Sequence, residues 1–315
     1  MLLHNGWVRP FAVQGYLQAV DSIFTGDALT DQMAGLLEPL KWNGYLWGVP
    51  VDVNPYVIVW SRALLVQSGL NAPPNDLAAL QAAVLRMIEQ DEASTIVNWS
   101  PGDLNQQLVW LATFSTDRAN LIQMKAFNKE QEELLIWMED MAERIGSIPA
   151  DSMSELNAAL QDHSSLAAVL PWDIYERLNT NIQEGLMIDR NAVIYPWLNG
   201  RSFVISSTST YAEEAMQWIQ EMADAEHQQS NYGQFNRLPA RASLYTQNAT
   251  IQEKSASSRI PPSWWKAVLD AKEENQLPTP DPLWPEKWRH RTELWQEHSE
   301  NGIQLRSYLN AMTID

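Results

Sequence analysis

The sequence contains no cysteine, and this absence excludes disulfide bonds, thiolate nucleophiles and zinc–thiolate sites. No apolar stretch approaches the roughly 20 residues that a membrane-spanning helix needs. The segment from Met1 to Trp7 lacks the charged start and the long apolar run of a signal peptide, so we expect none in this chain. Basic residues are also few: 21 Lys and Arg stand against 39 Asp and Glu. The net charge of -18 repels nucleic acid and anionic membranes, which excludes both as expected partners.

Apolar residues and tryptophan, by contrast, are plentiful. Apolar residues make up 45% of 315 positions, which is enough for two domains that each have a core. The unusual number is 15 tryptophans. A tryptophan ring is a large flat apolar face with one polar N–H group. The composition therefore fits either a large aromatic core or aromatic platforms for a ligand, and counting does not separate the two.

Three segments have the periodicity of amphipathic helices. Residues 76–90 form the first, with Asp76 as its N-cap. Residues 128–145 form a stronger one, and Gly146 is predicted to end it. The third covers residues 211–223. The last third of the chain is predicted to be helical, with prolines between its helices at Pro261, Pro262, Pro278, Pro280, Pro282 and Pro285.

Three short apolar runs predict strands, at Tyr56–Trp60, Leu166–Leu170 and Phe203–Ser206. A helical pattern follows each of them, which indicates an α/β protein. We find no internal repeat and no flexible linker. If the chain forms two domains, we therefore expect it to cross between them more than once.

The order and spacing of several short segments resemble the family 1 extracellular solute-binding proteins of ABC importers, the group that contains maltose-binding protein. No single segment is specific, and the weight lies in their arrangement over most of the chain. One departure is that Asp76 and Leu77 stand where the family has Thr-Trp. The matching segments are Trp42–Pro50, Val57–Leu65, Ser68–Pro74, Ser165–Trp172, Ser206–Ala215, Leu238–Arg241 and the C-terminal stretch from Pro278 to Met312.

The resemblance implies a helix-rich α/β fold of the type II periplasmic-binding-protein kind, with two lobes, hinge strands between them and the ligand held between the lobes. Lobe I is expected to comprise residues 1–54 and 203–252, and lobe II residues 55–202 and 253–315 with the C-terminal helices. Phe11–Leu17 already resembles a segment well inside the family's first lobe. We therefore expect lobe I to be N-terminally incomplete.

The same resemblance implies a function. The chain is expected to capture a small molecule, a sugar or oligosaccharide, and to deliver it to the permease subunits of an ABC importer. Its expected location is the outer face of the cell membrane or the periplasm, and its expected state is a monomer. Neither catalysis, a cofactor nor a metal is expected.

Trp172 is the first candidate for a sugar platform, because it directly follows a strand and a proline where maltose binders place a stacking tryptophan. Asp173 beside it is a candidate partner for a hydroxyl group. The alternative is a buried tryptophan that packs inside the second lobe. Asp52 and Asn54 follow Gly-Val-Pro at the predicted hinge, and strand alternation puts both on one face. They are candidate polar contacts, and the alternative is a solvated hinge.

Other candidates come from segments that the family uses for ligand contacts. Trp99 precedes a helix expected to begin near Pro101, and a role in the core is as plausible for it as a role in binding. The remaining candidate ligand-binding residues are Tyr195, Trp197, Trp284, Trp288, Asn236 and Arg241.

Two other functions stay open. A carbohydrate hydrolase also uses tryptophan platforms, but it needs two facing carboxylates, and no motif places such a pair. A predicted helix carries His290, Glu293, Glu297 and His298 without the HExxH spacing, so a solvated helix face explains them better than a metal site does. The second alternative is a truncated paralogue that no longer binds a solute.

Overall fold

The computed structural model of this chain divides into two compact units, and both are discontinuous in sequence. Unit 1 consists of Met1–Pro55 and Tyr195–Pro285, and unit 2 of Tyr56–Ile194 and Glu286–Asp315. The structure describes residues 1–23, 30–90, 94–100, 102–149, 152–246, 260–272, 277, 281–300 and 304–312. Pro101, Pro278 and Pro280, and the predicted lobe boundary after residue 252, lie outside these ranges.

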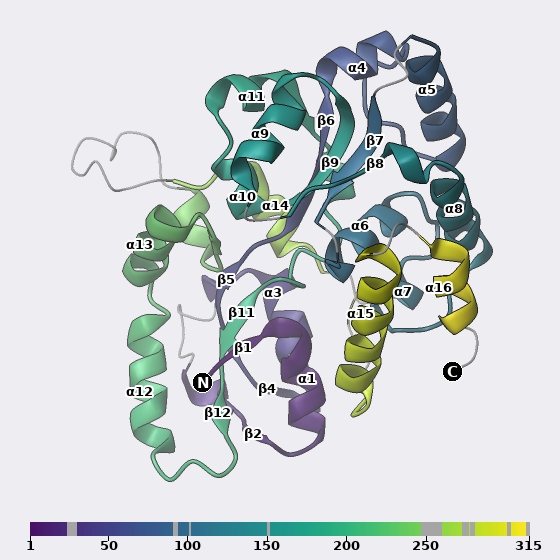
Figure 1. The fold of residues 1–315 in the computed structure, drawn as a ribbon. Helices are drawn as coiled ribbons and strands as arrows, with labels where there is room; N and C mark the ends of the chain where they lie inside the picture. Colours follow the sequence, from purple (N-terminus) through teal and green to yellow (C-terminus); the bar gives the residue numbers. More distant parts are fainter. Residues whose placement is uncertain are drawn as a thin grey trace. The chain divides into compact units, whose positions relative to one another are not determined.

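Unit 1 is built on a four-stranded sheet in the order β1-β11-β5-β13, and every neighbouring pair in it is antiparallel. Figure 1 shows α1 and α12 on opposite sides of the strands β1 and β11. The elements of unit 1 are β1 (Leu2–His4), α1 (Asn5–Val13), β2 (Leu17–Gln18), η1 (Asp21–Ile23), α3 (Ala34–Leu37), η2 (Glu38–Leu40), β3 (Lys41–Trp42), β4 (Tyr45–Leu46), β5 (Val49–Val53), β11 (Arg201–Phe203), β12 (Ile205–Ser206), α12 (Ala212–Met222), α13 (Ala225–Phe235), β13 (Leu238–Pro239), η5 (Ala242–Tyr245) and α14 (Trp264–Asp270).

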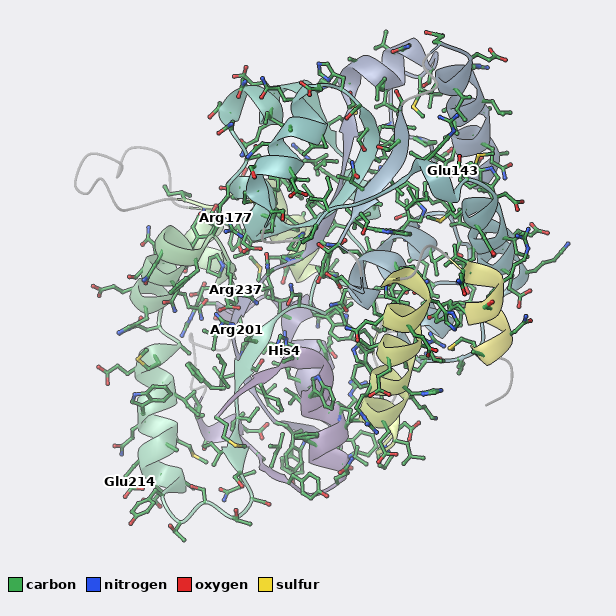
Figure 2. The ribbon with its side chains drawn as sticks, in the orientation of Figure 1. His4, Glu143, Arg177, Arg201, Glu214 and Arg237 are labelled. Atoms are coloured by element: carbon green, nitrogen blue, oxygen red, sulfur yellow. The ribbon has the colours of Figure 1, made fainter. Side chains whose placement is uncertain are left out.

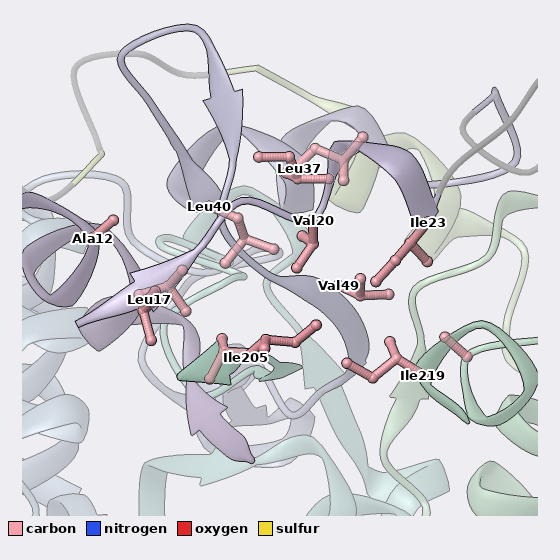
Figure 3. Packing of buried hydrophobic residues seen from close by; sticks show 13 residues of the cluster. Ala12, Leu17, Val20, Ile23, Leu37, Leu40, Val49, Ile205 and Ile219 are labelled. Carbon is pink, nitrogen blue, oxygen red and sulfur yellow. The ribbon is translucent and has the colours of Figure 1, made fainter. Parts of the chain in front are cut away.

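Apolar side chains from α1, η2, β5, β12 and α12 form one core in unit 1 (Figure 3). Val8, Val20, Leu40 and Val49 in this cluster are completely buried. The hairpin β3–β4 lies next to it and turns through Asn43 and Gly44, which both have positive φ. Asn-Gly is the pair that favours this kind of tight turn, so the local sequence explains the hairpin.

Unit 2 contains a five-stranded sheet in the order β10-β6-β9-β7-β8. β7 is parallel to β8 and β9, whereas β6 is antiparallel to β9 and β10. Its elements are β6 (Tyr56–Ser61), α4 (Arg62–Gln67), α5 (Leu77–Gln90), β7 (Thr95–Trp99), α6 (Leu104–Thr113), α7 (Ala119–Ile122), α8 (Lys129–Asp140), η3 (Ala142–Arg144), β8 (Ile145–Ser147), α9 (Met153–Gln161), β9 (Ser165–Pro171), α10 (Trp172–Glu176), α11 (Thr180–Gly185), β10 (Leu186–Ile188), η4 (Arg190–Ala192) and α16 (Leu305–Met312).

The central strands of unit 2 are buried along almost their whole length. All residues of β6 are buried, and so are all residues of β9 except Pro171. Burial on both faces requires helices on both sides, and α4 and α6 both contact β6 and β9. The continuous apolar runs that predict these two strands are the sequence signature of this arrangement, and both strand predictions are confirmed.

The three predicted amphipathic helices are confirmed, one of them with a corrected end, whereas Pro285, expected between helices, is the second residue of the C-terminal helix Trp284–Glu300. α5 begins where expected, because the carboxylate of Asp76 accepts a hydrogen bond from the backbone N–H of Ala79 at 2.7 Å. The helix predicted over residues 128–145 ends at Asp140. Gly146 is not its terminator but lies in β8, where it pairs with Asn98 of β7. The prediction was wrong here because apolar residues of a short strand continued the helical pattern in phase.

The predicted strand over Phe203–Ser206 is in fact two strands. β11 ends at Phe203 and pairs with β1 and β5, whereas β12 begins at Ile205 and pairs with β2. The chain therefore changes sheets at Val204. Apolar alternation does not reveal such a change, because both strands bury side chains in the same core.

The unit boundaries differ from the predicted lobe boundaries at positions 202 and 252. β11 begins at Arg201 and is hydrogen-bonded to β5, so the chain has already entered unit 1 by then. α14 packs on α3 of unit 1, and a Cβ atom on Gly35 would collide with the backbone carbonyl groups of Leu269 and Ala271. Contacts between segments distant in sequence therefore decide at which residues the chain passes from one unit to the other.

The C-terminal helices complete unit 2. α15 (Trp284–Glu300) begins at the end of unit 1 and continues into unit 2. In unit 2 the buried guanidinium of Arg291 donates to the carbonyl oxygens of Leu121 and Lys125 and lies 5.1 Å from the centre of the Phe127 ring. α16 packs on α8 and is joined to it by an Arg306–Asp140 ion pair at 2.7 Å. Over the ranges given above, no helix has the length and apolar character needed to cross a bilayer.

Candidate ligand-binding site

Asp52 in unit 1 holds two arginine side chains that come from distant parts of the sequence. In the sheet, Asp52 of β5 faces Arg201 of β11 on one side and Pro239 of β13 on the other. Its buried carboxylate accepts hydrogen bonds from Nε of Arg201 at 3.0 and 3.1 Å and from Nε of Arg237 at 2.7 Å. A fourth hydrogen bond comes from Nη2 of Arg201. Strand register thus assembles a group that no local sequence motif contains.

This cluster carries an excess of positive charge. Two guanidinium groups share one carboxylate, and the hydrogen bonds to Asp52 raise the pKa of Arg201. His4 of β1 pairs with Arg201 in the sheet. Desolvation lowers the pKa of His4, and repulsion by Arg237 and Arg201 lowers it further. His4 is therefore neutral near pH 7, and the cluster has one net positive charge. His4, Arg201 and Arg237 are labelled in Figure 2.

The two arginines retain hydrogen-bond donors. Nη2 of Arg237 donates to the carbonyl oxygen of Asn199 at 2.7 Å. Within the part of the chain that the structure describes, Nη1 of Arg201 and Nη1 of Arg237 have no hydrogen-bond partner. The Arg201 side chain is 33% exposed. A preorganised guanidinium with a spare N–H group is suited to hydroxyl or carboxylate oxygens of a ligand.

In unit 2, polar groups gather at one edge of the sheet. The parallel strands β7 and β9 end there, and the antiparallel β6 begins there, with Tyr56 facing Pro171. The hydroxyl of Tyr56 donates to Oδ2 of Asp103 at 3.0 Å and accepts from Nδ2 of Asn105 at 3.2 Å. The carboxyl ends of parallel strands are the usual position for ligand contacts in α/β proteins.

Burial changes the acidity of this group. Burial raises the pKa of Tyr56 well above its ordinary value, and the negative charges of Asp103 and Asp173 raise it further. Burial also raises the pKa of Asp103, although the hydrogen bonds from Tyr56 and from backbone N–H groups oppose the shift. Oδ1 of Asn105 is buried and has no partner among the described residues. The group therefore presents an unused acceptor beside a neutral phenol.

The predicted residues Trp172 and Asp173 lie at this same edge. Trp172 is the first residue of α10, directly after β9, and its ring lies 5.2 Å from that of Tyr175 at an angle of 31°. The Trp172 residue is only 1% exposed. The Asp173 side chain is 24% exposed and interacts with Arg177 at 3.4 Å. Asp173 also acts electrostatically on Tyr56, which places it in the Tyr56 group.

Trp99 ends β7 and is buried. Its ring packs edge-on against Trp295, with 5.7 Å between the ring centres. A small cavity of about 10 Å³ lies beside it, lined in part by Ser100, Gln106 and Ile174. This volume is close to that of one water molecule, so the cavity is too small for a sugar.

Among the other predicted residues of unit 1, the rings of Trp197 and Trp284 both lie beside Gly6. Asn54 is buried, and its backbone N–H donates to the carbonyl oxygen of Asn199 at 3.2 Å. Tyr195 and Trp197 are buried in the turn before β11, where Tyr195 has a positive φ of 53°. Trp284 is buried edge-on against Trp7.

Asn236 and Arg241 lie on either side of β13. Asn236 caps the end of α13 in the left-handed conformation. Arg241 donates twice to the carbonyl oxygen of Ala223, at 3.0 and 2.8 Å. Trp288 lies on α15 in unit 2, where its carbonyl oxygen accepts from Thr292. Whether any of the predicted residues contacts a ligand stays a prediction.

The sequence did not point to Tyr56, Asp103, Asn105, Arg201 or Arg237. Tyr56 belongs to an apolar strand, and Asp103 is an ordinary N-cap that accepts from the backbone N–H of Asn105. A useful signal would have been that each lies where a predicted strand meets a turn or helix. Which polar residues at such ends meet one another depends on the order of the strands in the sheet.

Comparison with solved structures shows the fold. The sugar-binding protein MalE from the phytopathogen Xanthomonas citri matches with a TM-score of 0.69 at 14% identity, covering 99% of this chain and 80% of the other. Maltose-bound MalE3 from Thermotoga maritima matches with a TM-score of 0.66 at 13% identity, covering 99% and 82%. A solute-binding protein of an ABC transporter from Agrobacterium vitis, with bound D-mannitol, gives the same TM-score, identity and coverage. The predicted helix-rich α/β fold of the periplasmic-binding-protein kind is thus confirmed.

The comparison of sequences is consistent with this fold. A search of curated protein sequences finds no significant match. The family model described as bacterial extracellular solute-binding protein matches residues 1–258, which is most of the chain. This protein belongs to the family of bacterial extracellular solute-binding proteins.

Proposed function

We propose that this chain binds a carbohydrate outside the cytoplasm and delivers it to the permease subunits of an ABC importer, without chemical turnover. Membership of the solute-binding family supports capture and delivery. Similar folds are seen in a protein with bound maltose and in one with bound D-mannitol, which supports a hydroxyl-rich ligand.

The observation that carries the carbohydrate proposal is the sheet edge in unit 2. Oδ1 of Asn105 is a buried acceptor without a partner among the described residues, and it lies beside the Tyr56 hydroxyl. An unpaired buried acceptor is costly, and a ligand hydroxyl would satisfy it. The carboxylate of Asp173 offers a stronger, charged acceptor at the same edge.

Trp172 adds an apolar face to this edge. A pyranose ring has a C–H face that packs well on an aromatic ring, and its hydroxyl groups bond to the surrounding acceptors. The ring is buried in this structure, so its present neighbours would have to move before a sugar stacks on it. Taken by itself, unit 1 also has donors suited to oxygen atoms of a sugar, namely the Nη1 groups of Arg201 and Arg237.

Calorimetric titration of the intact chain with a panel of saccharides and polyols tests the proposal, beginning with maltose and D-mannitol. We expect one or more of them to bind and, at 100 times its Kd, to raise the free energy of unfolding by about 2.7 kcal/mol. Asn105→Ala should raise the Kd of that ligand about tenfold, because a hydroxyl group of the ligand loses its acceptor. If no member of the panel binds, the carbohydrate proposal fails.

A matched control separates binding from folding. Asn157 on α9 also has a buried side-chain oxygen without a partner among the described residues, and its Nδ2 donates to the carbonyl oxygen of Met153. Asn157→Ala should leave the affinity unchanged. Product analysis after prolonged incubation with the bound saccharide tests the absence of turnover, and release of a shorter sugar would identify a hydrolase instead.

Delivery and oligomeric state need their own measurements. Uptake of the labelled ligand into vesicles that contain the importer should depend on added protein. Sedimentation equilibrium should give the mass of a single chain, because we propose a monomer.

A further inference from the structure

We infer that unit 1 carries a second binding site, for a neutral hydroxyl-rich small molecule, in a cavity whose wall contains Gln32. The cavity has a volume of about 530 Å³. Small-molecule pockets in proteins measure about 300–1,000 Å³. The residues of the Asp52 cluster and of the sheet edge in unit 2 do not line it.

Gln32 is the observation that points to a ligand. The residue is 4% exposed, and neither its amide oxygen nor its amide nitrogen has a hydrogen-bond partner over the described ranges. A buried amide that leaves both groups unpaired is rare, because nearly all buried polar groups in proteins find partners. A ligand in the cavity that both donates and accepts would satisfy this amide.

The residues on either side of Gln32 hold it in position, Asp31 through its carboxylate and Met33 through its backbone. Asp31 accepts from the backbone N–H of Ser243 at 2.7 Å and from its hydroxyl at 2.9 Å. The backbone N–H of Met33 donates to the carbonyl oxygen of Ala240 at 3.0 Å. Gln32 itself forms a β-bridge with Arg241. The amide is therefore part of a rigid wall and not a side chain at the end of a free loop.

Two aspartates in the cavity wall have one oxygen engaged and one available. Oδ1 of Asp21 accepts from the backbone N–H of Leu46 at 3.1 Å, and Oδ1 of Asp270 accepts from that of Ala34 at 2.8 Å. No hydrogen bond to Oδ2 of either residue occurs within the described part of the chain. Each carboxylate is thus oriented by the backbone and still able to accept from a ligand hydroxyl.

The rest of the wall selects against charged ligands. Lys41 and Lys272 both approach Glu38, at 2.7 and 3.9 Å, so their charges are partly balanced. The lysines disfavour a cation, and the aspartates disfavour an anion. Leu37 and Leu46 line the cavity with apolar side chains and belong to the core cluster of unit 1; Leu37 is labelled in Figure 3. Acceptors, a donating amide and apolar side chains together suit a polyol or monosaccharide.

The test is calorimetric titration of Asn105→Ala in the full chain with D-glucose, D-galactose and D-mannitol, one at a time. The Asn105→Ala background weakens the proposed main site about tenfold. Loss of the remaining binding when Gln32→Leu is added would then assign that binding to the cavity. We expect at least one of the three probes to bind. Adding Gln32→Leu should weaken this binding at least about tenfold, because the leucine has a similar size but cannot hydrogen-bond.

Stability supplies a second readout that a structural role of Gln32 would not produce. Gln32→Leu should leave the Tm of the chain equal or higher, since it removes an unpaired buried amide. A lower Tm together with unchanged probe binding would overturn the inference. So would the absence of binding by all three probes, or binding of ethanolamine or acetate in preference to them. The proposed main site can fail its own test without affecting these outcomes.

Discussion

Asp52 and Arg201 face each other across the antiparallel pair β5–β11, and the guanidinium of Arg201 donates to both oxygens of the buried carboxylate. Arg237 donates to the same carboxylate from the other side. Asp52 is therefore the anion that holds two cations beside the sheet of unit 1. A ligand would meet the arginines before it met Asp52, which is 2% exposed.

Asp52→Asn should destabilise the chain by about 2–4 kcal/mol, because two guanidinium groups lose their counter-charge. The value lies below that for a fully buried pair since the Arg201 side chain is 33% exposed. Urea unfolding measures it. Asp140→Asn, which removes the exposed ion pair with Arg306, should destabilise the chain far less than Asp52→Asn does. Equal losses in both variants would contradict the central role of Asp52.

His4 and His227 should contribute to the stability of the chain with opposite dependences on pH. The pKa of His4 in the folded chain is lowered from 6.5, by desolvation and then by the arginines. The unfolded state therefore binds more protons just below pH 6.5, and this contribution to stability is lost as the pH falls from about 6.5 to the folded pKa. In His4→Gln that loss should disappear, which unfolding at pH 5 and pH 8 measures.

For His227 the sign is reversed. The hydrogen bond to Asp224 raises its pKa above 6.5. Its stabilising contribution is complete below about pH 6.5 and is lost as the pH rises through the folded pKa. His227→Gln should therefore lower stability at pH 5 and not at pH 8. Both histidines are exposed to solvent, so the effects are small, and a shared direction in the two variants would refute the assignment.

Tyr56→Phe should cost about 1–3 kcal/mol, because Asp103 loses a donor and Nδ2 of Asn105 loses its acceptor. The loss should depend on pH. The Tyr56 hydroxyl lowers the pKa of Asp103, so its removal raises that pKa further. At low pH, Asp103 in the variant becomes protonated, and a neutral carboxyl group no longer needs the missing donor. The stability lost in Tyr56→Phe should therefore be smaller at pH 4 than at pH 8. A loss that does not vary with pH would argue against the hydrogen bond.

Trp172→Phe should lower the affinity for the carbohydrate about tenfold, because phenylalanine offers a smaller aromatic face. Trp172→Ala is less informative, because truncating a buried tryptophan costs about 3–5 kcal/mol of stability. Trp60→Phe is the matched control, since Trp60 is as buried and stacks on Trp110 inside the same sheet's core. If both phenylalanine variants bind with the wild-type affinity, Trp172 is a packing residue only.

Gly35→Ala should destabilise unit 1 by about 1–3 kcal/mol, because the new methyl group would collide with the carbonyl groups of Leu269 and Ala271. Thermal unfolding measures this. Gly185→Ala, whose methyl group would meet only His163 at 3.8 Å, should be close to neutral. An unaffected Tm in Gly35→Ala would contradict the packing of α14 on α3.

Local signals in the sequence were sufficient wherever an element depends on its own residues. Asp76 caps α5 through its neighbour Ala79, and the Asn43–Gly44 pair makes the turn of β3–β4, because in both cases the interacting groups lie within a few residues. The continuous apolar runs of β6 and β9 likewise follow from burial on both faces. The order of the matching segments along the chain was enough for the family resemblance.

The tertiary structure alone decided what depends on pairing between distant segments. The cluster of Asp52 with Arg201 and Arg237 joins groups 149 and 185 residues apart, and one step of strand register would separate them. Three further features depend in the same way on which strand or helix lies alongside. They are the helix end at Asp140, the division between β11 and β12, and the unit boundary at Pro285. Composition and periodicity determined that the chain forms buried strands and amphipathic helices, whereas the order of those elements in space determined which polar side chains meet.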